Sequence, residues 1–293
     1  ETLPQGTETY QGRSIMVSGA GGSVGSELCR QLLSCRPRKI VLYEVSEVSL
    51  YTIDKELHDL AAHSGVEICP VLGSVTDSRL TRMVIADHKV EVIFHAAAYK
   101  HVPLVEMNPI PGLANNVLGT RTLADAANDL GVKRFILISS DKAVRPTNIM
   151  GASKRLAELV VQDMAKRSNG TVFSMVRFGN VLGSSGSVIP LFKEQIAKGG
   201  PVTLTHEDVT RFFMTITEAA RQAALAASYM AGYRVAALLA TAGALYFAGW
   251  FGNPDSGYQH GAWASTYLLF AMLMLPGLIT TLWMREPPVP LQT

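Results

Sequence analysis

The sequence predicts an α/β fold with a doubly wound parallel sheet, followed by a two-helix transmembrane hairpin. Between residues 14 and 176, six short apolar runs rich in β-branched residues alternate with amphipathic stretches. Charged residues become rare near the C-terminal end, since residues 222–293 hold only two basic and two acidic side chains. Two uncharged stretches there, 235–251 and 262–284, approach the length with which a helix crosses a bilayer.

Each apolar run is bounded by Gly, Asp, Asn or Ser, as buried strands usually are. Strands are expected at Ser14–Val17, Lys39–Tyr43, Glu67–Leu72, Val90–His95, Phe135–Ser139 and Val172–Val176. Between them, helices are expected at Ser23–Leu33, Arg79–Asp87, Gly119–Leu130 and Ala152–Ala165. Regular alternation of strand and helix implies parallel strands with helices on both faces of the sheet.

The predicted domains are a polar leader, 1–13, an α/β domain, 14–221, and the hairpin, 222–293. Arg234 precedes the first uncharged stretch and Arg285 follows the second. The positive-inside rule therefore places both ends of the hairpin, and the α/β domain, on the cytoplasmic side of a membrane. The alternative is a helical hairpin buried inside a globular protein.

Charge and cysteine content exclude several classes of partner. The formal net charge is only +2, so no basic excess indicates a nucleic-acid partner. Neither the three cysteines nor any pair of histidines has the spacing of a metal site. No metal is expected.

A glycine-rich turn follows the first predicted strand. Gly19, Gly22 and Gly25 have the spacing G-x-x-G-x-x-G. Ser23 and Val24, the first two residues of the predicted helix, are expected to contact the cofactor. The first glycine allows the tight turn, the second lets a pyrophosphate approach the backbone, and the third lets helix and strand pack closely. Strand, turn and helix together predict a Rossmann-like dinucleotide site, the alternative being a glycine turn without a ligand.

Glu44 stands at the end of the second predicted strand. A carboxylate at that position accepts hydrogen bonds from ribose hydroxyls and repels a 2′-phosphate, which favours NAD and leaves NADP open. Ser26 follows Gly25 where a Walker A loop would have Lys, so that loop is excluded.

The fifth predicted strand leads into Ser140, Asp141 and Lys142, and the next helix begins near Met150 and Lys154. A short-chain dehydrogenase has Tyr-x-x-x-Lys at the latter position, with Tyr as the base. Met150 cannot transfer a proton, which disfavours a simple dehydrogenase. Asp141 and Lys142 are the candidate acid and base. Their spacing alone favours a catalytic pair and a solvated surface pair equally.

Five segments carry a family resemblance: GAGGSVGSELCRQ, FHAAAYKHVPLVE, NNVLGTRTLADAA, SSDKAVRPTNIMGASKR and VRFGNVLGSSGSVIPLFKEQIAKGGPVTLTH. They resemble the nucleotide-sugar 4,6-dehydratases of bacterial polysaccharide biosynthesis, in the extended short-chain dehydrogenase superfamily. The resemblance is strongest to the branch that acts on UDP-N-acetylglucosamine and also has Met in the Tyr position.

The resemblance implies oxidation of the sugar at C4, loss of water across C5 and C6, and reduction at C6, with NAD(P) recycled. Lys142 would remove the C5 proton, Asp141 would protonate the departing C6 hydroxyl, and Ser140 would contact the C4 oxygen. Lys154 would hold the nicotinamide ribose.

Further positions follow from the same resemblance. Cofactor contacts are implied for Ser74, where the family usually has Asp, and for Val75, Ala96, Ala97, Ala98 and Asn116. Substrate contacts are implied for Lys100, His101, Asn180, Ser187, Thr203 and Arg211. The partners expected are a UDP-N-acetylhexosamine and, through the hairpin, the cytoplasmic face of the bacterial inner membrane, with a homo-oligomer left open.

The dehydratase pattern is expected to stop near residue 220, which would truncate the substrate lid and impair activity. The tail resembles a helical hairpin of major facilitator muropeptide permeases, so the chain is interpreted as a chimera. The alternative functions are a nucleotide-sugar 4-epimerase, disfavoured by Met150, a non-catalytic membrane-anchored nucleotide-binding module, and a transporter fragment.

Overall fold

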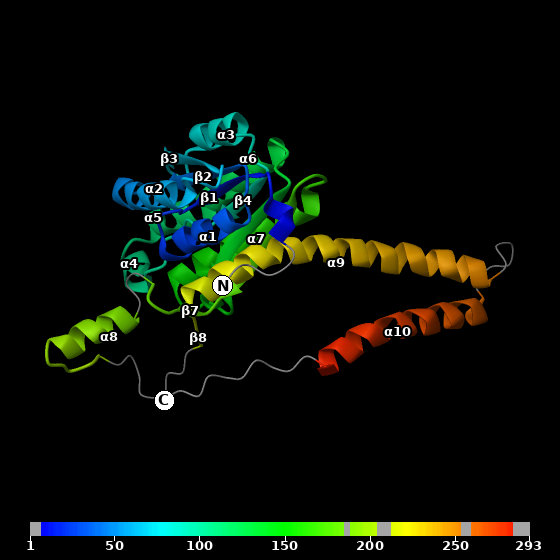
Figure 1. The fold of residues 1–293 in the computed structure, drawn as a ribbon. Coiled ribbons are helices and arrows are strands. Elements are labelled where there is room, and N and C mark those ends of the chain that lie inside the picture. Colours follow the sequence, from blue (N-terminus) through cyan, green and yellow to red (C-terminus); the bar gives the residue numbers. More distant parts are fainter. Residues whose placement is uncertain (1–6, 185–187, 204–211, 253–258, 284–293) are drawn as a thin grey trace. The chain divides into compact units, whose positions relative to one another are not determined.

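The computed structural model describes residues 7–184, 188–203, 212–252 and 259–283 (Figure 1). The chain divides into two compact units, Glu1–Tyr229 and Met230–Thr293.

A six-stranded parallel sheet forms the centre of the first unit. Its strand order is β3-β2-β1-β4-β5-β6. The strands are β1 (Ser14–Ser18), β2 (Lys39–Glu44), β3 (Glu67–Leu72), β4 (Val92–His95), β5 (Arg134–Ser140) and β6 (Val172–Phe178). All six predicted strands are confirmed, with small shifts at their ends. Because the order reverses between β1 and β4, a crevice is expected at the carboxyl ends of these two strands.

Helices cover both faces of the sheet, as predicted (Figure 1). The long ones are α1 (Ser23–Ser34), α2 (Glu47–Ala61), α3 (Ser78–Asp87), α6 (Gly119–Asp129) and α7 (Ile149–Arg167). Side-chain caps fix three of their starts: Ser46 accepts from the Ser49 N–H, Asp77 from the Leu80 N–H, and Asn148 from the Gly151 N–H.

The strands bury side chains on both faces. Ile15 and Val17 of β1 belong to one apolar cluster, which includes Leu28 of α1, whereas Met16 belongs to a second cluster with Leu123 of α6. Successive side chains of a strand point to opposite faces, so this division gives two helix layers around one sheet.

Several short elements were not predicted. After β4 come α4 (Val102–Met107), α5 (Pro109–Leu113) and one π-helical turn (Ala114–Leu118). After β6, β7 (Asn180–Val181) pairs in parallel with β8 (Phe213–Met214), and α8 (Val188–Ala197) lies between them in the chain.

The first turns of α9 (Ile216–Phe251) complete the first unit. Ala219, Ala220, Ala223 and Ala224 are fully buried in the cluster that contains α1, and the Tyr10 hydroxyl donates to the Ala224 carbonyl. Small side chains allow this close approach of helix and core.

The second unit holds the rest of α9 and α10 (His260–Trp283), so helices form where the hairpin was predicted. They pack on each other: the rings of Phe247 and Phe270 are 6.2 Å apart, and Ala262 and Thr266 are buried. Within the described residues, however, no helix combines the length and the hydropathy needed to cross a membrane. The prediction that 235–251 and 262–284 span a bilayer is therefore not confirmed.

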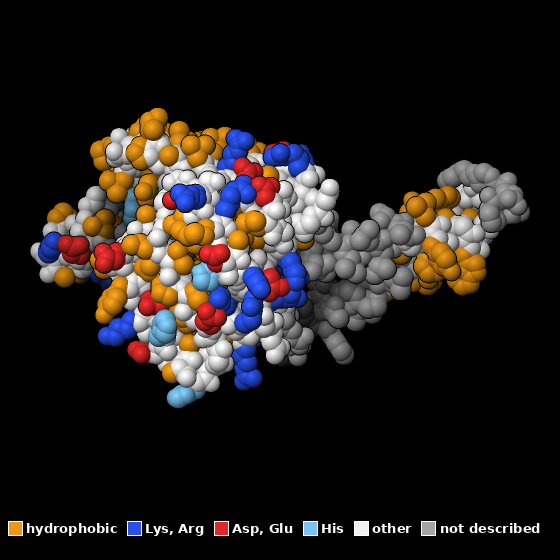
Figure 2. Space-filling view, turned by 90° about the horizontal axis from the view of Figure 1, so that it is seen from above, with side chains coloured by type: hydrophobic (Ala, Val, Ile, Leu, Met, Phe, Trp, Pro, Cys, Tyr) orange, Lys and Arg blue, Asp and Glu red, His pale blue; other side chains and the backbone are white. Residues whose placement is uncertain are grey.

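Figure 2 shows basic and acidic side chains interspersed over one face of the first unit. On this face the two signs alternate, in accord with the small net charge.

Candidate active site

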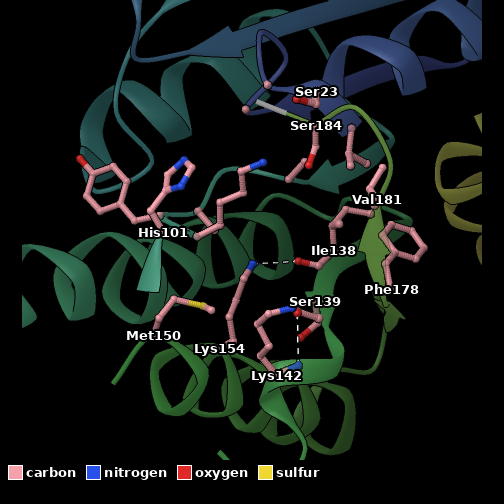
Figure 3. A pocket seen from close by; sticks show the side chains of 18 of the residues that line it. Ser23, His101, Ile138, Ser139, Lys142, Met150, Lys154, Phe178, Val181 and Ser184 are labelled. Carbon is pink, nitrogen blue, oxygen red and sulfur yellow. Dashed lines mark hydrogen bonds between the residues drawn. The ribbon is translucent and has the colours of Figure 1, made fainter. Parts of the chain in front are cut away.

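A cavity of about 700 Å³ opens at the carboxyl ends of the strands, where the sheet order reverses (Figure 3). Its walls come from the glycine turn after β1, the segment after β4, the end of β5, the head of α7 and the segment after β6. The predicted site residues among its lining are Gly19, Gly22, Ser23, Val24, Gly25, Ala96, Ala98, Lys100, His101, Ser140, Lys142, Met150, Lys154 and Asn180. Sequence segments far apart are thus brought to one place.

The glycine turn has the geometry that the spacing predicted. Gly19 has a φ of +72°, and a Cβ there would lie 2.6 Å from the Ala97 nitrogen. A Cβ on Gly25 would lie 2.0 Å from the Gly19 oxygen, so both positions require glycine. Gly22 precedes α1 and no side chain caps this helix. The N-terminus of α1, with a glycine at its N-cap position, lies at the cavity and suits an anionic group.

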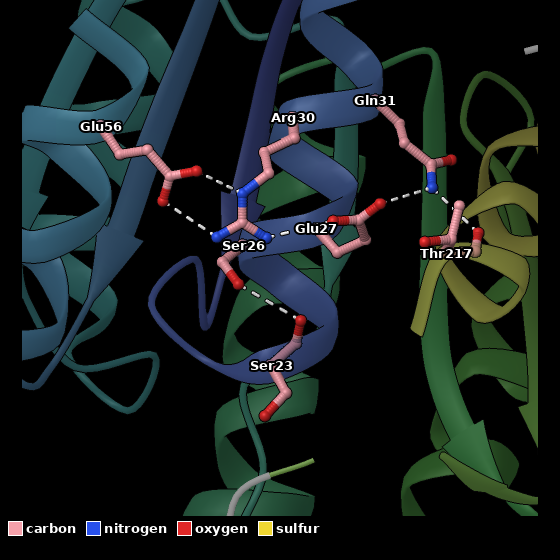
Figure 4. Close-up of polar contacts among 7 residues, drawn as sticks. All are labelled: Ser23, Ser26, Glu27, Arg30, Gln31, Glu56 and Thr217. Atoms are coloured by element: carbon pink, nitrogen blue, oxygen red, sulfur yellow. Dashed lines mark hydrogen bonds and ion pairs between the residues drawn. The ribbon is translucent and has the colours of Figure 1, made fainter. Parts of the chain in front are cut away.

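An ion-pair network fixes α1 behind this turn (Figure 4). Arg30 of α1 donates to both carboxylate oxygens of Glu56 on α2, and also to Glu27. Gln31 donates to the Thr217 carbonyl at the start of α9. The helix that presents its N-terminus to the cavity is therefore held from two sides.

Glu44 lies beside the glycine turn and is not among the residues that line the cavity. Its carboxylate accepts the backbone N–H groups of Gly21, Val45 and Ser46 at 3.0, 2.9 and 3.0 Å. One oxygen takes two of these bonds and the other takes one, so the second oxygen keeps room for a further donor. Glu44 shapes the turn as well as standing where a ribose is expected.

Four other predicted cofactor contacts also lie outside the cavity lining: Ser74, Val75, Ala97 and Asn116. The Ser74 carbonyl accepts from the Tyr43 hydroxyl, and Val75 belongs to the core. Asn116 is buried and bonds the N–H and the carbonyl of Tyr99 as well as the Ser153 hydroxyl. Asn116 thus holds the segment that carries Lys100 and His101.

Asp141 and Lys142 follow β5 directly. Lys142 Nζ lies 3.1 Å from Asp141 Oδ1 and 3.2 Å from Asn180 Oδ1, and the Ser140 hydroxyl donates to Asp141 at 3.0 Å. Lys142 lines the cavity, whereas Asp141 is half exposed beside it. The predicted acid and base are neighbours, and Asn180 from β7 helps to orient the amine.

Lys154 and Met150 lie at the head of α7, and both are buried (Figure 3). Lys154 Nζ donates to the Ile138 carbonyl at 3.0 Å. Burial lowers the pKa of Lys154 to about 8, against the opposing effect of the Glu158 carboxylate. Near neutral pH this amine is a cation in an apolar wall of the cavity.

His95 is buried at the end of β4, directly before Ala96 of the cavity lining, and its role was not predicted from the sequence. Its ring contacts the Ser18 and Thr120 hydroxyls at 2.7 and 2.9 Å. Burial, aided by the positive charge of Lys154, lowers the pKa of His95 to about 3, so the ring is neutral. His95 thus joins the carboxyl ends of β1 and β4 to α6 by hydrogen bonds.

Glu158 was also missed. Its side chain is fully buried and accepts hydrogen bonds from Ser139, Arg155 and Arg177. A carboxylate one helical turn after Lys154 was the available signal, because i and i+4 share a helix face.

The remaining substrate-contact predictions are placed as follows. Thr203 bonds Gln195 of α8 and is not among the lining residues. Ser187 and Arg211 lie outside the described residues. Partial burial lowers the pKa of Lys100, which lines the cavity.

In the described ranges, no cluster of His, Cys, Asp or Glu is arranged to hold a metal.

A family model described as "Polysaccharide biosynthesis protein" matches residues 15–240. The chain belongs to this polysaccharide biosynthesis protein family. The match runs past residue 220, where we expected the family pattern to stop, and the comparisons show no permease relationship for the tail.

Three curated proteins to which this chain is similar carry different names. The capsular polysaccharide biosynthesis protein CapD of Staphylococcus aureus is 50% identical over 71% of this chain and 35% of its own length. The UDP-N-acetylglucosamine 4,6-dehydratase (inverting) of Campylobacter jejuni is 33% identical over 71% of this chain and 61% of its own length. A UDP-glucose 4-epimerase of Rickettsia rickettsii is 36% identical over 70% of this chain and 60% of its own length.

Among solved structures, the dTDP-glucose 4,6-dehydratase DesIV of Streptomyces venezuelae, crystallised with NAD and TYD, matches with a TM-score of 0.63 and 23% identity. The alignment covers 73% of this chain and 72% of DesIV, which shows that the two share a fold. This chain spans between 35% and 65% of the length of four curated relatives that it matches.

Proposed function

We propose that this chain carries the nucleotide-sugar site of a UDP-N-acetylglucosamine 4,6-dehydratase that works with NAD in polysaccharide biosynthesis. The observation that carries the proposal is the pair Asp141–Lys142, with Lys142 in the cavity wall opposite the glycine turn, combined with Met150 in the position of a tyrosine base. The Campylobacter jejuni relative has the proposed activity in its name.

The cavity fits a dinucleotide. A Cβ added to Gly22 would meet only the Gly19 oxygen, at 3.3 Å, so this part of the turn presents backbone rather than side chains. The uncapped start of α1 suits the pyrophosphate, Glu44 suits the ribose of NAD, and Lys154 suits the second ribose. DesIV holds NAD on the same fold. NAD would supply the reversible removal of hydride from the sugar.

The chain's own residues then divide the proton transfers. As C4 becomes a ketone, its hydroxyl proton passes through the Ser140 hydroxyl, which lines the cavity, to solvent. The C5 proton then becomes acidic, and Lys142 Nζ takes it as a neutral amine and returns it to C5 after reduction at C6. The reacting pair is therefore neutral amine and carboxylic acid, the proton-shifted form of the ion pair that joins the two side chains at 3.1 Å. Asn180 Oδ1 holds the Lys142 nitrogen in the cavity. Asp141 gives a proton to the departing C6 hydroxyl, for which its side chain turns from the half-exposed position toward the cavity. Ser140 binds the C4 oxygen.

The second candidate is a UDP-sugar 4-epimerase, because the Rickettsia rickettsii epimerase matches this chain about as well as the dehydratase does. Such epimerases generally have Tyr as the base at the position of the buried Met150, whereas the dehydratase branch that this chain resembles also has Met there, which disfavours the epimerase.

Incubation of the full chain with NAD and UDP-N-acetylglucosamine separates the alternatives. A dehydratase releases a nucleotide sugar lighter by one water, detected by mass spectrometry. An epimerase gives an isomer of unchanged mass, detected by chromatography. If the chain binds NAD and UDP without changing the sugar, it is a non-catalytic binding module and the proposed activity is wrong.

A further inference from the structure

Glu158 connects three elements that form the cavity, α7, β5 and β6. It stands on α7 and accepts from the Ser139 hydroxyl of β5 at 2.8 Å. Two nitrogens of Arg177 on β6 reach its two oxygens at 2.7 and 2.6 Å, and Arg155 on α7 adds a bond of 2.9 Å. The Glu158 side chain has no exposed surface.

Each of these contacts lies next to a residue of the site. Ser139 follows Ile138, whose carbonyl accepts from Lys154, and precedes the Ser140–Lys142 segment. Arg177 is followed in the chain by Phe178 and Asn180, both of which line the cavity. A shift of Glu158 would therefore move the acid–base pair and the Lys154 amine relative to each other.

The charge of Glu158 matters as well as its position. A buried carboxylate is costly unless it is paired, and here two guanidinium groups pair it. Burial alone would raise the pKa of Glu158, but the hydrogen bonds from Arg177, Ser139 and Arg155 outweigh it and bring the pKa to about 2. The carboxylate is thus an anion one turn after the buried Lys154, whose side chain donates to a neutral carbonyl.

We infer that Glu158 is a positioning residue of the active site, which holds the ends of β5 and β6 against α7 and places a negative charge one helical turn after Lys154. This inference rests on the proposed function in that it assigns Glu158 to the support of that site. The charged or titratable groups around Lys154 are Glu158 on α7, His95 on β4, and Lys100 and Lys142, which line the same cavity. Arg155 and Arg177 pair with Glu158.

The test measures the protonation of Lys154 directly. Because Lys154 lines the cavity, its reaction with acetic anhydride can be followed by mass spectrometry as the pH is raised, and the midpoint reports its titration. Glu158→Gln keeps the size of the side chain and an acceptor for Ser139 but removes the charge. We expect the midpoint to fall by about one pH unit, since an opposite charge one helical turn away on α7 is removed.

Glu91→Gln is the matched control. Glu91 also accepts from two cationic side chains, Arg13 and Lys133, and its pKa is likewise lowered to about 2, but it lies at the amino end of β4. The two variants are expected to lose thermal stability alike, while only Glu158→Gln shifts the Lys154 midpoint and lowers kcat per bound NAD, by about tenfold or more.

Equal Lys154 midpoints in Glu158→Gln and the unchanged protein would overturn the inference. If Glu158→Gln does not fold, Arg177→Gln removes one of the two cations that pair with Glu158, and the Lys154 midpoint should then rise. An unchanged midpoint in that variant also counts against the inference. The labelling needs no turnover, so a shifted midpoint in a chain without dehydratase activity rejects the proposed function and leaves the role of Glu158 supported.

Discussion

Lys154 on α7 donates a hydrogen bond of 3.0 Å to the carbonyl oxygen of Ile138 on β5. This bond fixes a buried amine at the edge where β5 meets the cavity. A backbone carbonyl is a neutral partner, so the ammonium keeps much of its desolvation cost. Burial of the Lys154 ammonium in the site therefore lowers the stability of the folded protein.

Lys154→Met is expected to make the protein more stable and inactive. The folded-state pKa, about 8, lies below the ordinary value of 10.5, so burial penalises the protonated form at every pH below about 8. Removing the charge should raise the free energy of unfolding by roughly 2 kcal/mol at pH 7. Urea unfolding at several pH values measures the gain, which should shrink as the pH rises from 8 toward 10.5.

Lys198→Met is the control for this experiment, because Lys198 is exposed and pairs with Glu194 on the surface. Its effect should stay within about 0.5 kcal/mol. If Lys154→Met destabilised the protein at pH 7, the ammonium would be better solvated than its burial indicates.

The sheet could be predicted from the sequence because each strand is a short apolar run bounded by turn residues, and all six appear in the structure. The glycine turn was predictable for the same reason, since its requirement for glycine is local in the chain. Lys142 was singled out through the family resemblance, because spacing alone left a solvated surface pair as an equal alternative, and the fold places it in the cavity lining. Glu158 and His95 were missed because their roles depend on partners brought together only by the fold, such as Arg177 and Thr120. The short elements after β4 and β6 carry little periodicity, and their positions depend on packing.

Gly19→Ala should weaken NAD binding by displacing the turn. Its Cβ would meet the Ala97 backbone nitrogen at 2.6 Å, in addition to the strain of a φ of +72°. We expect a loss of stability of about 3 kcal/mol and NAD affinity reduced by at least about tenfold. Fluorescence titration with NADH and urea unfolding measure the two effects.

Gly131→Ala separates strain from contact. Gly131 has a φ of +68° and no atom within 4 Å of the added Cβ. This variant should lose about 1 kcal/mol and keep its NAD affinity. Equal effects of the two substitutions would show that backbone strain alone, and not the approach to Ala97, makes Gly19 necessary.

Asp141→Asn should stop dehydration without preventing proton removal at C5. The amide keeps an oxygen for Ser140 and Lys142 but cannot protonate the C6 hydroxyl, so the rate of water loss should fall by about 100-fold or more. In deuterated water Lys142 should still exchange the C5 proton, and mass spectrometry would find deuterium in recovered substrate.

Lys142→Met tests the other half of the pair, since it should lose both the exchange and the dehydration. Asp163→Asn, which alters an exposed ion pair with Arg167, should leave both unchanged. Full dehydration by Asp141→Asn would mean that another group is the acid.

Glu91 bonds to the segments at the amino ends of β1 and β5, as Glu158 bonds to residues near the carboxyl ends of β5 and β6. It accepts from Arg13 before β1 and Lys133 before β5, at 2.6 and 2.7 Å, and from the Ser14 N–H. Burial raises its pKa, but the bonds from Lys133, Arg13 and Ser14 prevail and lower it to about 2. The unfolded chain therefore binds more protons between pH 2 and the ordinary value of 4.5, and stability must fall as the pH falls through that window.

Glu91→Gln should accordingly cost roughly 1 kcal/mol at pH 7 and progressively less toward pH 2, because the unchanged protein loses the same contribution on acidification. Urea unfolding of both proteins at pH 7, 5, 4 and 3 measures the convergence, with Glu194→Gln, in an exposed pair with Lys198, as the control that should stay close to the unchanged protein throughout. A constant difference across these pH values would mean that Glu91 acts through packing rather than charge, and that the acid sensitivity of the sheet arises at its carboxyl end, where Glu158 has the matching pKa.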